Sequence, residues 1–317
     1  MTARRKLSDF FMSNLCQADG ILSPILKRTK RDQTLDFEIR ENEVHIYYRG
    51  GRILQIKSAS NYFTCGFDAE YAKEWPCPKF PSVLKEQADS ESVVAAIPLL
   101  KEVMDFFFAE HKDKSEREFQ QLIVRENNYS IISNATDYFI VDLEYATPGA
   151  RFDLVAIKWD SNGTKRQKNG LVTTPPKLAL CELKYYTAAL DGKAGLLQHV
   201  EDAALFLSNE DHVRLLKKDA LSIFEQKRKL QLVTFGPGGN ANAVDRLDES
   251  IELILMLANY DPECSKLRNA LEALPVTPNV EIKFAVANFM GYGLFKEGIH
   301  DLATFKEQFN RQIYCGS

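Results

Sequence analysis

The chain has 317 residues, of which 45% are hydrophobic and 11% aromatic, and its formal net charge is −4. This length allows two domains, and the composition excludes collagen-like, low-complexity and largely disordered proteins. A net negative charge argues against a surface that is uniformly basic for nucleic acid. Local basic patches remain open, because association depends on how charge is distributed over the surface.

The longest apolar stretches, residues 93–100 and 251–258, are far shorter than the ~20 residues that a membrane helix requires. Polar residues near the N-terminus interrupt what would be the apolar segment of a signal peptide. The six cysteines are scattered without a CxxC pair, which is typical neither of a zinc site nor of a disulfide scaffold. The sequence therefore predicts a cytoplasmic protein that does not contact a membrane.

Residues 1–91 are expected to form an N-terminal β-rich domain. Alternating apolar and polar residues, separated by short turns, predict an antiparallel β-meander. The expected strands are 35–39, 44–48, 52–57 and 62–67.

Residues 92–317 are expected to form a second domain, with a mixed sheet flanked by helices. The run at 251–258 is almost continuously apolar, as in a strand that is buried on both faces. The whole chain is therefore placed in the α+β class. The expected strands of this domain are 138–145, 152–159, 177–185, 232–235, 251–258 and 280–287, and the expected helices are 93–108, 115–127, 193–229 (with breaks), 265–274 and 301–309.

Charged residues inside two of these strands are the most informative feature of the sequence. Side chains of like parity share one face of a strand, so Glu182 and Lys184 project together and Leu183 points the opposite way. Asp153 lies in the preceding, otherwise apolar strand. Buried charges of this kind are unfavourable unless they are paired or bind a metal.

Two carboxylates on paired strands, which lie ~4.8 Å apart, can bind one hard cation such as Mg²⁺ or Mn²⁺. Asp153 and Glu182 are the predicted ligands, and the carbonyl of Leu183 is a further candidate. Such an ion can polarise a phosphate oxygen and lower the pKa of a bound water. Lys184 is then placed to orient or deprotonate that water, or to stabilise the phosphate.

This D…E-x-K arrangement resembles the PD-(D/E)XK nuclease superfamily, over roughly residues 95–210. The resemblance implies a restriction-endonuclease-like core and a catalytic acid on the preceding helix, for which the motif spacing selects Glu116 and leaves Glu118 as the alternative. It also implies a catalytic glutamine on the later helix, which matches Gln198. Phe152 replaces the nominal proline of the motif.

Other charged residues are given a structural interpretation. Asp142 and Glu144 share a face of one strand and could reach a second metal, but the solvated face of an edge strand is favoured. His199 is interpreted as a surface histidine rather than a phosphate ligand. Phosphate contacts are expected from the six lysines and arginines of 214–229 or from the polar insert at 165–168.

The sequence thus predicts a magnesium-dependent nuclease that hydrolyses phosphodiester bonds, with DNA favoured over RNA as its partner. The alternatives are a catalytically inactive module of the same fold that binds nucleic acid or protein, and an unrelated interaction protein. If the chain is an unrelated interaction protein, Glu182 and Lys184 would be exposed on an edge strand, distant from Asp153. A homodimer remains open.

Overall fold

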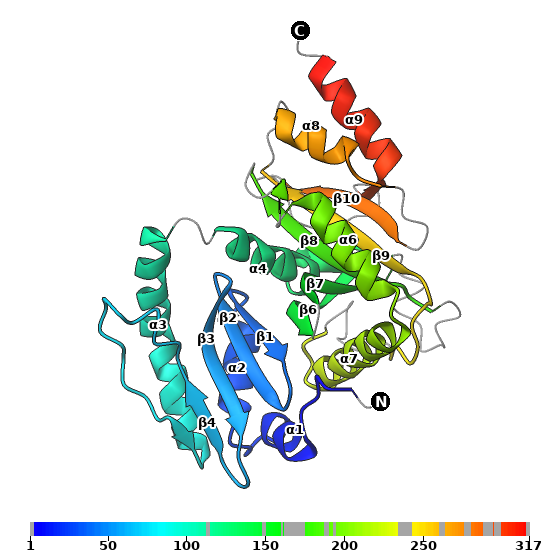
Figure 1. The fold of residues 1–317 in the computed structure, drawn as a ribbon. Helices are drawn as coiled ribbons and strands as arrows, with labels where there is room; N and C mark the ends of the chain where they lie inside the picture. Colours follow the sequence, from blue (N-terminus) through cyan, green and yellow to red (C-terminus); the bar gives the residue numbers. More distant parts are fainter. Residues whose placement is uncertain are drawn as a thin grey trace.

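The computed structural model contains two β-sheets with helices packed around them (Figure 1). The five strands of the first sheet follow in chain order, and the second sheet has six strands in the order β11-β10-β9-β8-β7-β6. The α+β class is therefore confirmed. The structure describes residues 3–111, 115–147, 150–159, 161, 175–186, 190–192, 195–233, 243–259, 264–275, 280–287, 294 and 299–314.

The first sheet is the predicted antiparallel meander, extended by a short fifth strand. Two helices that the sequence analysis did not predict precede it. Their start signals are local: the Ser8 side chain accepts a hydrogen bond from the amide of Phe11, and Pro24 occupies the first turn of the second helix. The elements are α1 (Asp9–Cys16), α2 (Ser23–Arg31), β1 (Leu35–Ile39), β2 (Glu43–Tyr48), β3 (Gly51–Ser58), β4 (Phe63–Gly66) and β5 (Val83–Leu84).

Helix α3 (Gln87–Glu110) packs against this first sheet and against α2. Its buried side chains, among them Val93, Ile97 and Met104, join the core of the N-terminal unit. The domain boundary placed between residues 91 and 92 lies inside this helix. The chain enters the second unit only at α4, as Figure 1 shows.

The second sheet is built from an antiparallel group followed by parallel strands. Strands β6, β7 and β8 pair antiparallel in chain order, and β9 then pairs parallel to β8. The chain therefore crosses from β8 to β9 through helices. The elements are α4 (Ser115–Asn128), the 3₁₀ turn η2 (Ile131–Asn134), β6 (Tyr138–Thr147), β7 (Ala150–Lys158), β8 (Leu178–Tyr185), α6 (Leu196–Leu207), α7 (Glu210–Lys229), β9 (Ile251–Ala258), α8 (Ser265–Glu272), β10 (Glu281–Ala287), β11 (Ile299–Asp301) and α9 (Leu302–Tyr314).

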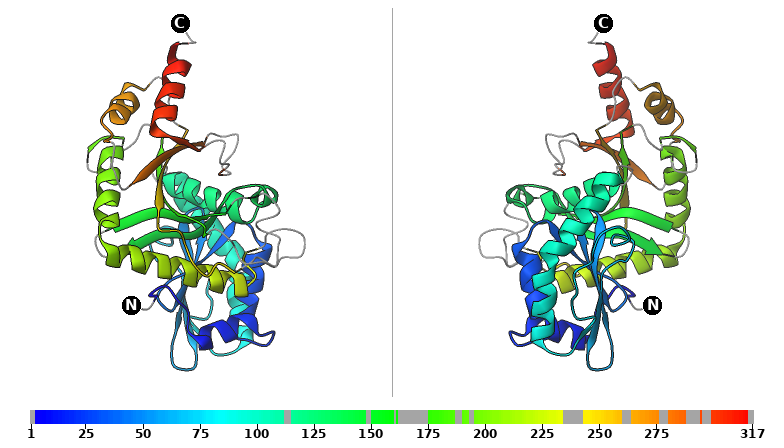
Figure 2. Two further views of the ribbon diagram at one scale, coloured as in Figure 1. Left: turned by 90° about the vertical axis from the view of Figure 1, so that its right-hand side faces the viewer. Right: turned by 90° about the vertical axis from the view of Figure 1, so that its left-hand side faces the viewer.

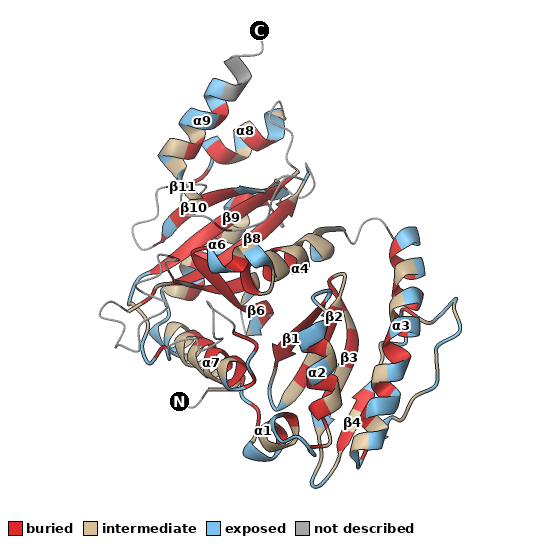
Figure 3. Ribbon diagram, turned by 180° about the vertical axis from the view of Figure 1, so that it is seen from behind, coloured by how far each residue is buried: buried red, intermediate tan, exposed pale blue. Residues whose placement is uncertain are grey.

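Helices cover both faces of the second sheet. Figure 2 shows α6 and α7 on one side and α4 on the other. Alternate residues of the central strands accordingly join two apolar clusters: Leu180 belongs to the same cluster as Val200 of α6, whereas Cys181 belongs to the same cluster as Ile123 of α4. Strand β9 is buried along its whole length, as predicted (Figure 3). Most side chains on both faces of the central strands are therefore buried.

Two predicted features fall partly or wholly outside what the structure describes. Residues 232 and 233 are not in a strand, and the rest of the strand expected at 232–235 lies outside the described residues. The basic insert at 165–168 also lies outside them. No helix among the described residues is long and apolar enough to span a bilayer.

A buried ionic network joins the two units. Asp142 of β6 is fully buried, and its two carboxylate oxygens bond Nη1 of Arg5 at 2.5 Å and Nη1 of Arg40 at 2.6 Å. Lys227 of α7, also fully buried, pairs with Glu38 of β1 at 2.8 Å. The network thus connects the N-terminal segment, the first sheet, β6 and α7.

The interpretation of Asp142 as a residue on a solvated face was therefore wrong. Strand β6 is an edge strand of its own sheet, but Arg5 and Arg40 cover it at this point. A β-bulge between Ile140 and Asp142 also shifts the register of β6 against β7. Glu144 is half-buried and takes part in a different cluster.

A candidate metal site on the central hairpin

The pairing of β7 with β8 brings the two predicted carboxylates together. The strands are antiparallel with Leu154 opposite Cys181, and continuing this register by one residue places Asp153 opposite Glu182. The pairing of β7 with β8 ends at that point. The backbone amide of Leu183 donates a hydrogen bond to the side chain of Asp153, with 2.8 Å between the nitrogen and Oδ2. The prediction that these two residues share one face of adjacent strands is therefore consistent with the observed register.

Glu182 and Lys184 are buried in the centre of the sheet. Their exposed fractions are 2% and 4%, and β8 lies between β7 and β9. The alternative in which both residues are exposed on an edge strand is therefore wrong. Asp153 is half-buried and lies where the pairing of β7 with β8 ends.

Burial and mutual repulsion make the carboxylates difficult to ionise. Burial, and then the charge of Asp153, raise the pKa of Glu182 to about 9, although Lys184 acts in the opposite direction. Burial also raises the pKa of Asp153, while the Leu183 amide and Lys184 lower it. Without a cation, Glu182 therefore holds its proton more strongly than an isolated carboxyl does.

One oxygen of this pair has no hydrogen-bond partner among the described residues. Oε1 of Glu182 is buried and accepts no hydrogen bond from any residue that the structure describes. A buried, unsatisfied carboxylate oxygen is unfavourable and calls for an explanation such as an absent ion. This atom is the strongest structural indication that the pair binds something.

His199 of α6 is a site residue that the sequence analysis assigned to the surface. Its Nε2 lies 2.8 Å from Nζ of Lys184, and its Nδ1 lies 3.2 Å from Oε2 of Glu182. Because an ammonium group only donates, Nε2 must accept, which leaves the proton on Nδ1 to be donated to Glu182. The imidazole therefore connects the two functional residues of the E-x-K tripeptide.

Gln198 points elsewhere. Its side-chain amide donates to Oδ1 of Asp202, one turn further along α6, at 2.9 Å. Adjacent helical residues are separated by about 100° around the axis, so placing His199 at the carboxylates turns Gln198 away. The position that the resemblance assigned to Gln198 is thus occupied by its neighbour.

Glu116, the helix acid selected from the sequence, lies near the pair. Burial and the charge of Asp153 raise its pKa, while Lys184 and the backbone amide of Tyr185 lower it. Phe119, one turn later on α4, packs its ring 4.7 Å from that of Tyr185, which fixes the helix over the end of β8. α4 thus brings a third acid within electrostatic range.

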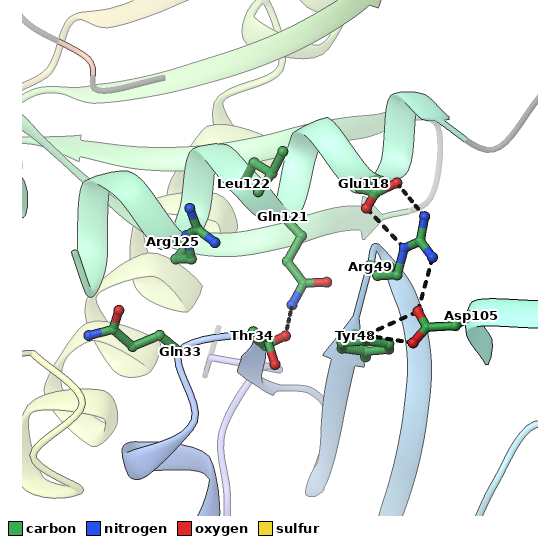
Figure 4. A pocket seen from close by; sticks show the side chains of 9 residues that line it. All are labelled: Gln33, Thr34, Tyr48, Arg49, Asp105, Glu118, Gln121, Leu122 and Arg125. Carbon is green, nitrogen blue, oxygen red and sulfur yellow. Dashed lines mark hydrogen bonds and ion pairs between the residues drawn. The ribbon is translucent and has the colours of Figure 1, made fainter. Parts of the chain in front are cut away.

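The alternative acid, Glu118, belongs to another feature. Its carboxylate pairs with the guanidinium of Arg49, whose Nε lies 2.9 Å from Oε1. Both residues line a cavity of about 300 Å³ between the first sheet and α4 (Figure 4). Figure 4 shows Arg49 held between Glu118 and Asp105, at the junction of the two units.

The donor set suits a hard divalent cation. Among the described residues, no three histidine, cysteine or acidic side chains are placed to hold one ion, so the candidate side-chain ligands are Asp153 and Glu182. The Leu183 amide faces Asp153, and the carbonyl of a strand residue faces the same neighbour as its amide. Mg²⁺ typically binds one or two carboxylates and completes its shell with waters and substrate phosphates. The residues present therefore fit Mg²⁺ or Mn²⁺.

No model of a known protein family, no characterised protein and no solved structure matches this chain.

Proposed function

We propose that this protein is a Mg²⁺- or Mn²⁺-dependent nuclease that hydrolyses phosphodiester bonds, with DNA as the favoured substrate. The observation that carries the proposal is the pair of Asp153 with the buried Glu182, beside the buried Lys184, with one Glu182 oxygen that accepts no hydrogen bond from any described residue. The order of the functional residues along the chain supports it. A helix acid, a strand aspartate and an E-x-K strand follow one another, as in the nuclease superfamily that the sequence resembles.

Each protein group has a role that follows from its position. Asp153 and Glu182 would hold the cation, with the Leu183 carbonyl, and Glu116 would complete the shell through water. When bound, the cation stabilises charge on the phosphate and lowers the pKa of the attacking water. Lys184 is close enough to the same carboxylates to orient that water and to compensate negative charge at the phosphorus.

His199 is a positioning residue in this scheme. It accepts a hydrogen bond from Lys184 and donates one to Glu182, so it limits the rotamers of both side chains. A long lysine side chain loses considerable conformational entropy when it is ordered. The contacts with His199 order it before substrate binds, which is the preorganisation that catalysis requires.

The test is a plasmid-nicking assay with Mg²⁺ or Mn²⁺ on the full-length protein. We expect cleavage that depends on the divalent ion and that falls by about a thousandfold or more in Asp153→Asn, since the cation contributes several kcal/mol to the transition state. Asp211→Asn is the matched control, because Asp211 is an exposed acid on α7. We expect that variant to retain full activity.

The inactive-module alternative makes a different prediction for the same assay. A folded wild-type protein that leaves both DNA and RNA intact with Mg²⁺ and with Mn²⁺ would reject the nuclease proposal. Cleavage that persists unchanged in Asp153→Asn would reject the assignment of the site.

A further inference from the structure

Two exposed arginines flank the carboxylate site. Arg117 follows Glu116 in the first turn of α4, and Arg151 precedes Asp153 by two residues on β7, so it shares a strand face with Asp153. Both guanidinium groups contact Oε1 of Glu144, Arg151 at 2.6 Å and Arg117 at 3.8 Å. The two cations therefore lie side by side, next to the acids.

Both arginines have donors to spare. Their exposed fractions are 45% for Arg117 and 57% for Arg151, and each guanidinium carries five N–H donors in a planar fork. A carboxylate oxygen that is shared between two exposed arginines is a weak, solvent-screened partner. A phosphate, with more oxygens to share, can accept paired hydrogen bonds from guanidinium groups.

The charges of these two arginines act on the acids of the candidate site. Arg151 lowers the pKa of Asp153, while Glu144 raises it. Arg117 likewise lowers the pKa of Glu116. Substrate phosphates approaching three acidic side chains would otherwise be repelled, so nearby cations are needed wherever the nucleic acid lies beside them.

Glu144 is held in an unfavourable backbone conformation. Its φ is 56°, in the left-handed region, which is unfavourable for a non-glycine residue. The neighbouring residues are anchored on both sides, with Leu143 O accepting from Arg40 and the Tyr145 hydroxyl bonding Asp219. This conformation keeps the Glu144 carboxylate between the two arginines.

We propose that Arg117 and Arg151 bind phosphates of the substrate strand next to the bond held at Asp153 and Glu182. Glu144 keeps the two guanidinium groups aligned until the phosphates replace it. This inference rests on the proposed nuclease function and assigns its substrate contacts. Two of the basic residues from which phosphate contacts were expected, both on α7, pair with acids: Lys227 is buried against Glu38, and Arg228 pairs with Glu225.

The experiment is an equilibrium binding titration of labelled duplex DNA, by fluorescence anisotropy, over a series of salt concentrations. All variants are made in full-length Asp153→Asn protein and measured in EDTA, so that no cleavage occurs. The substitutions are Arg117→Ala, Arg151→Ala, their double variant and Glu144→Gln. Arg311→Ala is the matched control, because Arg311 is an exposed arginine of α9 that pairs with a single acid, Glu307.

We expect each arginine substitution to weaken binding about tenfold, and the double variant to reduce the slope of log K against log salt by about 2. Glu144→Gln is expected to tighten binding, because it removes a competing anion. Arg311→Ala is expected to change neither quantity. Thermal unfolding of each variant verifies that it is folded.

The outcomes separate this inference from the function on which it rests. If the wild-type enzyme cleaves DNA, but the double variant binds DNA with unchanged affinity and unchanged salt dependence, the arginine assignment is wrong and the nuclease proposal stands. If Glu144→Gln weakens binding, the proposed competition is wrong. If the wild-type protein neither binds nor cleaves nucleic acid, both proposals fail.

Discussion

Replacing Lys184 with methionine is expected to reduce DNA cleavage by about 10²–10⁴-fold, with little effect on DNA affinity or on the fold. Methionine fills a similar apolar volume in this buried position, but it has no amine to orient water or stabilise the phosphate. Cleavage rates under single-turnover conditions and thermal unfolding of the same samples measure the two quantities. An unfolded variant would instead support a purely structural role for the lysine.

The same experiment tests the role of His199. We expect His199→Ala to lower kcat while KM stays near the wild-type value, because the imidazole acts through Lys184 and Glu182. His199→Gln, which retains one donor and one acceptor, should recover part of the loss. Equal rates for wild type, Lys184→Met and His199→Ala would show that neither residue takes part in cleavage.

Asp142→Ala is expected to lower the free energy of unfolding by about 3–5 kcal/mol, because it leaves Arg5 and Arg40 as buried charges without their acid. Burial alone would raise the pKa of Asp142, but Arg40 and Arg5 hold it below its ordinary value. The carboxylate therefore stabilises the fold above its unfolded pKa, and this contribution is lost as the pH falls through the lower, folded value.

Urea denaturation of Asp142→Ala beside Asp211→Ala measures this effect. Asp211 also pairs with an arginine, but both side chains are more than half exposed, so its removal should change stability by less than about 1 kcal/mol. A similar, small loss in both variants would contradict the view that the buried network joins the two units. A flatter unfolding transition in Asp142→Ala alone would indicate that the units then unfold separately.

Local periodicity was sufficient to predict much of this molecule. The alternation that placed Glu182 and Lys184 on one face depends only on the strand repeat, and the turns around 41–43 and 50–51 define the meander. Helix α4 was likewise predicted with its acids in the first turn. These features are determined within a few residues of chain.

Contacts between residues that are far apart in the sequence explain the wrong predictions for Asp142, Gln198 and His199. Arg5 and Asp142 are 137 residues apart, and no local pattern indicates that the first will cover the second. The sequence identified α6 but not its rotation about its own axis, which decides whether Gln198 or His199 meets the carboxylates. The sequence does contain one signal for His199. It is a histidine in the helix that directly follows the E-x-K strand.

The most direct test of the central claim is a calorimetric titration of the full-length protein with Mn²⁺, in buffers of different ionisation enthalpy. We predict one ion per chain, released protons, and an affinity that rises with pH up to about 9, because the ion displaces the proton that the raised pKa retains on Glu182. Asp153→Asn and Glu182→Gln should lose this site. Binding of Mn²⁺ that is unaffected by either substitution, or its absence from the folded wild-type protein, would contradict the account.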